Sequence, residues 1–117
     1  MRYAVVGSRE FAKPDLVRRC LDMVLKKGEP FTIVSGGAEG PDTVAKEWGD
    51  ANGVQVTVFP ADWDRLGDKA GPARNAQIVD ASDAMLAFWD GESNGTLDSI
   101  KRARSRKGYG RVLVWLG

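Results

Sequence analysis

The chain has 117 residues, the length of one ordinary globular domain, so we expect a single domain over residues 1–117. Its 17 Lys and Arg residues against 16 Asp and Glu residues give a net charge of +1, which counts against an obligatory nucleic-acid or anionic-membrane partner. The sequence contains no histidine, which excludes histidine triads and histidine metal ligands.

A single cysteine, Cys20, excludes an internal disulfide and a cysteine-rich zinc site, and it fits a reducing compartment. The apolar run near the N-terminus is too short for the core of a signal peptide, and no stretch approaches the roughly 18 apolar residues of a membrane span. We therefore expect a cytoplasmic protein without a membrane segment. Asp62, Asp64 and Asp68 crowd one loop, but their spacing matches no calcium-binding pattern, so neither a metal ion nor a resident cofactor is expected.

The first elements in chain order are a strand, a helix and a second strand. The apolar and β-branched run from Arg2 to Gly7 predicts the first strand. Apolar residues at helical spacing between Leu16 and Leu25 predict a helix that begins near Pro14 and stops at Gly28. The run from Phe31 to Ser35 predicts the second strand.

The middle of the chain repeats this order. A second helix is expected to begin near Gly40 and Pro41 and to end at Asn52 and Gly53, and its predicted buried residues are Val44, Ala45, Trp48 and Ala51. A third strand is predicted from Val54 to Phe59, and a third helix from about Pro72 to Ser82. The intervening segment, residues 60–71, is expected to be a loop.

The last part of the chain predicts a strand from Ala84 to Trp89, a helix that follows Gly95 and a strand from Arg111 to Leu116. The residues of this helix that are expected to face inward are Leu97, Ile100 and Ala103. Strict alternation of strand and helix predicts parallel strands joined by right-handed crossovers. The expected fold class is therefore α/β, a three-layer sandwich around a Rossmann-like five-stranded parallel sheet of order 3-2-1-4-5.

Ligands of such sheets bind beyond the carboxyl ends of the strands, at the point where the strand order reverses. Four loops reach this edge, and their sequences are GSREF (7–11), SGGAEGPD (35–42), PADWDRLGDKAGPARN (60–75) and DGESNGT (90–96). Glycines let a ligand approach the main chain closely, and exposed N–H groups at a helix start favour an anion. A phosphate fits this description, although the same glycines could serve only as turn residues.

The candidate ligand-binding residues share a position in these loops or at the start of the following helix. Arg9 and Arg74 could hold a phosphate with a bidentate fork, and Trp63 could stack on a base. Asn94-Gly95 could also form a hairpin turn, but the following LDSIKRAR does not alternate, so a helix start is favoured. The complete candidate set is Gly7, Ser8, Arg9, Gly36, Gly37, Asp42, Trp63, Arg74, Asn75, Asp90, Ser93, Asn94, Gly95 and Thr96.

The motifs GSREF, VSGGAEGPDTVAKEW, PADW, AGPARN and FWDGESNGT, in this order, closely resemble the YspA and YpsA-related branch of the SLOG superfamily. The resemblance implies a Rossmann-like fold that binds nucleotides or nucleotide-derived ligands. That superfamily includes LOG enzymes, which cleave the N-glycosidic bond of cytokinin riboside monophosphates, DprA, which binds single-stranded DNA, and sensor domains for NAD-derived signals. LOG relatives form dimers, so the resemblance also implies a homo-oligomer.

The LOG enzymes carry a PGGxGTxxE loop with an arginine upstream, and this chain matches that pattern only in part. Gly95 and Thr96 match the GT pair, and Arg74 stands where the upstream arginine would. The position of the catalytic glutamate falls on Ser99, which cannot manage a proton as a carboxylate does. Asp98 is one position away, which rotates its side chain by about 100° on a helix. Arg74 and Asp98 therefore stay as candidate catalytic residues, without an assigned reaction.

Three functions remain open from the sequence. The leading hypothesis is a domain that senses, carries or sequesters a nucleotide or an NAD-derived phosphorylated ligand. The alternative is hydrolysis of the N-glycosidic or phosphate bond of a nucleotide, which would need an aspartate as acid or base, and the candidates are Asp42, Asp62, Asp90 and Asp98. The third is DprA-like binding of single-stranded nucleic acid, against which the near-neutral charge counts.

Overall fold

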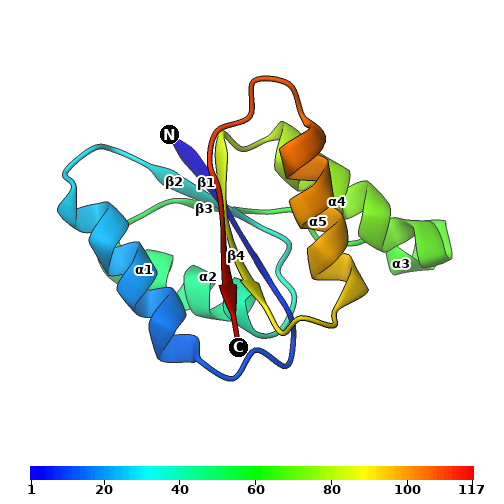
Figure 1. Cartoon of the computed structure of the whole chain (residues 1–117), viewed down its shortest axis with the longest axis horizontal. Helices are drawn as coiled ribbons and strands as arrows, with labels where there is room; N and C mark the ends of the chain where they lie inside the picture. The colour runs from blue at the N-terminus through cyan, green and yellow to red at the C-terminus, as the bar shows by residue number, and fades with distance from the viewer.

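The computed structural model describes all residues 1–117 and contains one sheet of five parallel strands (Figure 1). The strands are β1 (Arg2–Gly7), β2 (Thr32–Ser35), β3 (Val56–Val58), β4 (Ala84–Trp89) and β5 (Val112–Leu116). They lie in the order β3-β2-β1-β4-β5, and each neighbouring pair is parallel. The α/β class and the predicted strand order are therefore confirmed.

Two layers of helices cover the two faces of the sheet (Figure 1). Helices α1 (Pro14–Lys26) and α2 (Pro41–Asn52) lie on one face, and α4 (Ala70–Asp80) and α5 (Asn94–Ser105) lie on the other. Successive residues of β1 point to opposite faces, so Val5 packs with the α1–α2 layer while Ala4 and Val6 pack with the α4–α5 layer. None of the helices combines the length and the apolar character that crossing a membrane requires.

Local sequence explains where the helices beside the sheet edge begin and end. Pro41 occupies the first turn of α2, where its missing N–H group costs no hydrogen bond, and Gly53 ends this helix at a φ of 69°. Ser93 is the N-cap of α5, and its side chain accepts a hydrogen bond from the N–H group of Thr96. Helices α2 and α5 each follow a strand after a short loop, so their N-termini lie at the carboxyl edge of the sheet.

The segment after β3 differs from the predicted loop. It contains a short helix, α3 (Trp63–Leu66), and a 3-10 turn, η1 (Gly67–Lys69), and α4 begins at Ala70 rather than near Pro72. The Asp62 side chain caps α3 by accepting from the N–H group of Arg65 at 3.3 Å. Strand β3 covers only Val56–Val58 of the predicted Val54 to Phe59, because the N–H group of Val54 bonds to the carbonyl of Gly49 and not to the sheet.

Two predicted inward positions are also wrong. Ala51 is exposed, because Gly49 is the residue that faces inward at this end of α2. Gly49 lies so close to the sheet that a Cβ atom on it would be 2.4 Å from Val56 Cγ2. Leu97 is only half-buried, because α5 turns Thr96, Ser99, Ile100 and Ala103 inward instead. The small polar residues in that set allow α5 to line a cavity where a leucine would fill it.

Candidate functional site

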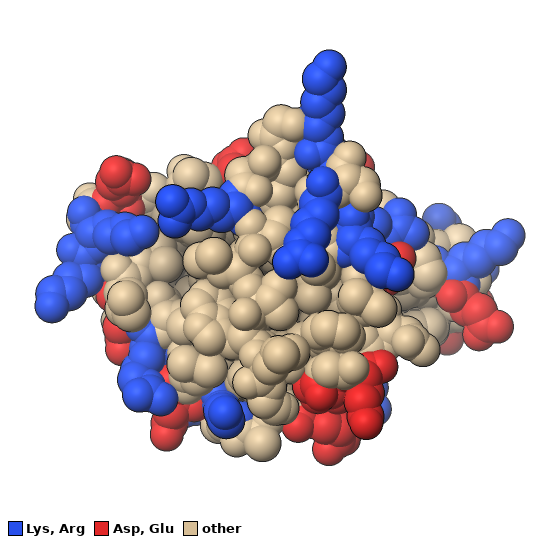
Figure 2. Space-filling view, in the orientation of Figure 1, with Lys and Arg blue, Asp and Glu red and all other residues tan.

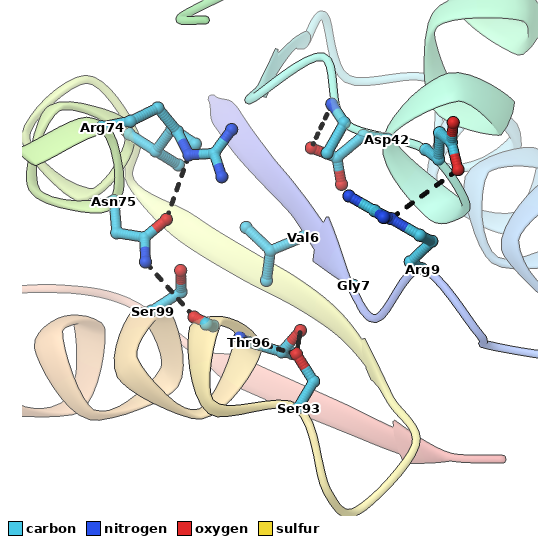
Figure 3. Close-up of a pocket in the computed structure, with 13 residues that line it drawn as sticks. Val6, Gly7, Arg9, Asp42, Arg74, Asn75, Ser93, Thr96 and Ser99 are labelled. Atoms are coloured by element: carbon cyan, nitrogen blue, oxygen red, sulfur yellow. Dashed lines mark hydrogen bonds and ion pairs between the residues drawn. The ribbon is translucent and has the colours of Figure 1, made fainter. Parts of the chain in front are cut away.

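A cleft of about 290 Å³ lies beyond the carboxyl ends of β1 and β4, where the strand order reverses (Figure 3). Arg74 and Asn75 reach it from α4, and Ser93, Thr96 and Ser99 reach it from the start of α5, with Val6 of β1 between the two groups. Only three of its thirteen lining residues are hydrophobic, so the cleft is suited to a polar or charged ligand.

The start of α5 forms one wall of the cleft. Ser93 Oγ accepts from the Thr96 N–H group at 3.4 Å, and Thr96 Oγ1 lies 3.3 Å from Ser8 Oγ. The N–H groups of Asn94 and Gly95 have no hydrogen-bond partner within the protein. Because the first turn of α5 carries no acidic residue, these N–H groups and the helix dipole favour an external anion.

Asp90 and Ser8 shape this wall without lining the cleft. Asp90 Oδ1 accepts from the N–H groups of Ser93 at 2.8 Å and Glu92 at 2.9 Å, and these backbone hydrogen bonds lower the pKa of Asp90. Ser8, which is buried, accepts from the N–H group of Asp90 at 3.0 Å. Asp90 and Ser8 therefore fix the bend that directs α5 toward the cleft.

Arg74 and Asn75 connect the other walls. Arg74 Nη1 donates to the carbonyl of Gly36 at 3.0 Å, and its Nε donates to Asn75 Oδ1 at 3.1 Å. Asn75 Nδ2 in turn donates to the carbonyl of Gly95 at 3.2 Å and to Asp98 Oδ2 at 3.0 Å. This chain of contacts holds the Arg74 guanidinium beside the cleft and ties α4 to the loop after β2 and to α5.

The loop after β2, residues 35–42, is closed by its own side chains. Asp42 is only 4% exposed, and its Oδ2 accepts from the N–H groups of Gly36 at 3.1 Å and Ala38 at 3.4 Å. The N–H group of Gly37 donates to Ser35 Oγ at 3.2 Å. Burial raises the pKa of Asp42 to about 6, although the backbone hydrogen bonds and Arg74 oppose this rise.

Glycine is required at two positions that bring α2 against β1. A Cβ atom at Gly7 would lie 2.3 Å from Pro41 Cγ and 2.8 Å from the carbonyl oxygen of Phe88. Gly40 has a φ of 85°, which side chains rarely permit, and a Cβ atom there would lie 2.9 Å from the carbonyl oxygen of Ser8. These glycines therefore allow the start of α2 to lie close to the end of β1 and the loop after it.

The structure brings the predicted residues together only in part. The candidates that line the cleft are Gly7, Arg9, Asp42, Arg74, Asn75, Ser93, Gly95 and Thr96. The candidates that lie outside its lining are Ser8, Gly36, Gly37, Trp63, Asp90 and Asn94. Of these, Ser8 is buried, Gly36 and Gly37 donate their N–H groups within their own loop, and Trp63 is 60% exposed on α3.

The two positions compared with the LOG glutamate are clearly separated. Ser99 is buried and lines the cleft, so the position that carries the glutamate in LOG enzymes faces the ligand space and bears a hydroxyl group. Asp98 lies outside the cleft lining, and its Oδ2 accepts from Asn75 and, at 2.8 Å, from Arg102 Nε. Asp98 therefore cannot replace the glutamate in this conformation.

The remaining lining residues, Val6, Ala38, Glu39, Ile78 and Ser99, were not among the sequence candidates. Val6 and Ile78 belong to the hydrophobic core and reach the cleft only at its floor. Ile78 follows Arg74 by four residues, one helical turn, and this spacing could have indicated it. Glu39 carries no sequence signal, and it contacts the cleft beside Arg9, whose Nε lies 3.6 Å from Glu39 Oε2.

Comparison with known proteins places this fold among described relatives. The model of the family described as "YspA, cpYpsA-related SLOG family" matches residues 1–66. The chain is 34% identical over 110 residues to the Gene 61 protein of Mycobacterium phage D29, covering 88% of each protein. A solved structure of DNA processing protein A from Helicobacter pylori, described for its single-stranded DNA binding mode, is similar with a TM-score of 0.70 and 20% identity. The similarity covers 97% of this chain and 64% of that one.

Proposed function

This chain belongs to the YspA, cpYpsA-related SLOG family, and we propose that its cleft binds the phosphate group of a nucleotide or an NAD-derived ligand. The observation that carries the proposal is the start of α5, where Gly95, whose N–H group has no partner, lines the same cleft as Arg74. An anion placed there meets helix-dipole, N–H and guanidinium partners together.

The charges around the cleft support one anionic group of limited size. Arg74 uses two of its five N–H donors within the protein, so donors remain for a ligand. Arg9 is 72% exposed and forms only a long contact with Glu39, so it is free to turn toward an anion. Asp42 opposes anion binding when ionised, and we therefore expect affinity to rise as the pH falls below about 6.

The proposal is tested by ligand-induced stabilisation. A panel of AMP, ADP-ribose, NAD and cyclic nucleotides should contain at least one compound that raises the melting temperature, since a ligand at 100 times its Kd stabilises by roughly 2.7 kcal/mol. Native mass spectrometry of protein taken directly from cells should then identify a retained nucleotide by its mass. The absence of any shift with millimolar concentrations of the whole panel would contradict the proposal.

Arg74→Ala provides the matching test of the site. Loss of a charge-assisted hydrogen bond costs about 1.5–3 kcal/mol, so affinity for the stabilising nucleotide should fall roughly 10- to 150-fold. Arg104→Ala is the control, because Arg104 is exposed near the end of α5, far along the helix from its N-terminus. Equal affinities for the two variants would show that Arg74 does not contact the ligand.

Hydrolysis of the bound nucleotide is the second candidate function, and Asp42 is the observation that favours it. A carboxyl group with a pKa of about 6 at the cleft can act as a general acid or base near neutral pH. Hydrolysis at the glycosidic bond would release free base from AMP or from cytokinin riboside monophosphates, which chromatography detects. If the Asp42→Asn variant releases no free base and the Asp98→Asn variant releases it at the wild-type rate, the activity is established and assigned to Asp42.

Single-stranded DNA is the third ligand class, favoured by the fold that the chain shares with DNA processing protein A. In Figure 2, Lys and Arg are spread over the upper half and the left side of the face shown. Asp and Glu cluster at the lower right and also lie among the cations at the left and right, and the centre is uncharged. This face therefore offers no continuous basic track for a phosphate backbone. The DNA function would be favoured if the protein bound single-stranded oligonucleotides more tightly than mononucleotides and if this affinity fell steeply with salt concentration.

A further inference from the structure

A second hollow adjoins the cleft on the other side of Arg74. This α3–α4 groove has a volume of about 530 Å³, and residues of the loop after β3, of helix α3 and of α4 line it. On α4, Ala70, Ala73, Arg74 and Gln77 follow one another at helical spacing, so they form one continuous wall. Arg65 and Leu66 of α3 contribute to the lining, so the helix that replaces the predicted loop forms part of the groove.

The groove differs from the cleft in its chemistry. Ala61, Leu66, Ala70 and Ala73 give it apolar surface, and the short alanine side chains leave the α4 wall free of projections. Gln77 supplies an amide that can donate and accept hydrogen bonds. The groove has two cationic residues, Arg74 and Arg65. Arg65 lies 3.5 Å from the Asp62 carboxylate, so the groove attracts an anion less strongly than the cleft does. A planar group with a polar edge suits this lining.

Arg74 belongs to both hollows. The residue lines the cleft and the groove, and hydrogen bonds to the Gly36 carbonyl and to Asn75 hold its guanidinium in place. A guanidinium so held can bind an anionic group on one side and contact a planar ring on the other. A ligand with an anionic end and a planar end therefore fits the two hollows together, whereas the 290 Å³ cleft alone is small for a whole nucleotide.

We propose that the α3–α4 groove binds the base of the nucleotide whose phosphate lies in the cleft, so that the two hollows form one bipartite site. This inference rests on the proposed function. It identifies the ligand class as base-bearing nucleotides and excludes sugar phosphates as the preferred ligands, because these would leave the larger hollow empty.

The test uses Ala73→Leu, which narrows the groove without touching the cleft. Ala73 is exposed on α4 and leucine is a good helix former, so the variant should fold normally. Its affinity for AMP should fall at least about tenfold, while its affinity for ribose 5-phosphate should match that of the wild type, both measured by calorimetry. Ala51→Leu is the matched control on an exposed position of α2, and it should change neither affinity.

The outcomes separate this inference from the proposed function. If the Ala73→Leu variant binds AMP as tightly as the wild type does, the groove assignment is overturned, while the proposal of phosphate binding in the cleft is unaffected. An equal loss of AMP and ribose 5-phosphate would also overturn it, because it would show that the substitution disturbs the cleft. Failure of both compounds to bind the wild-type protein would contradict the proposed function and the bipartite site together.

Discussion

The two glycine-rich loops at the carboxyl edge of the sheet, residues 35–42 and 90–96, resemble each other in sequence but differ in their electrostatics. Helix α2 carries Asp42 in its first turn, and this buried carboxylate accepts from the N–H groups of its own loop. Helix α5 has no acidic residue in its first turn, and the N–H groups of Asn94 and Gly95 have no partner. One helix start is already neutralised from within, and the other is open to an external anion.

The comparison teaches that glycine content alone does not identify an anion site. The loop at 35–42 needs its glycines for packing and conformation, and it contributes to the site through the Gly36 carbonyl that positions Arg74. The loop at 90–96 instead leaves the backbone N–H groups of Asn94 and Gly95 without a partner, and the proposed function assigns these to the anion. Substitutions in the two loops should therefore separate effects on stability from effects on binding.

The largest effect is expected for Gly40→Ala. Its φ of 85° and the approach to the Ser8 carbonyl oxygen combine backbone strain with a clash, which together should lower the free energy of unfolding by about 4 kcal/mol. Gly95→Ala is the control, because a Cβ atom there meets nothing within 4 Å and alanine favours a helix by up to about 1 kcal/mol. Urea denaturation measures both, and equal losses would contradict the difference between the loops.

The next effect concerns pH and Asp42. Because folding raises the pKa of Asp42 from 3.8 to about 6, the folded state binds the proton more tightly, and this contribution to stability is present at low pH and lost as the pH rises through about 6. Between pH 4 and pH 7.5 the wild type should lose about 2.4 kcal/mol relative to Asp42→Asn, since one pKa unit corresponds to about 1.36 kcal/mol and part of the difference lies below pH 4. Parallel pH profiles of the two proteins would show that Asp42 titrates normally.

A smaller effect is expected for Gly36→Ala. A Cβ atom there would lie 2.2 Å from Arg74 Nη1, the far end of a flexible side chain, so the unfolding free energy should change by less than about 1 kcal/mol. The displaced guanidinium should nevertheless weaken nucleotide binding about fivefold, equivalent to about 1 kcal/mol. Unchanged affinity in calorimetry would show that the Gly36 carbonyl does not position Arg74 for the ligand.

The sequence predicts the sheet well because strands and helices alternate strictly, and this pattern fixes which loops share an edge. Arg74 and Thr96, which the sequence assigns to loops at this edge, both line the cleft. The sequence does not predict α3, since four residues are too few for a periodic pattern and the helix depends on a local cap by Asp62. Nor does it predict the closure of the loop at 35–42, which depends on the Asp42 side chain turning back to Gly36.

The most direct test of the central claim is a two-dimensional amide NMR titration with AMP. If the phosphate binds at the start of α5, the largest chemical-shift changes should occur at the N–H groups of Asn94 and Gly95, which have no partner. Those of Gly36 and Gly37 should change much less, because they already bond to Asp42 and Ser35. Largest changes at residues 36–38, with residues 94–96 unmoved, would place the anion at α2 and contradict this account.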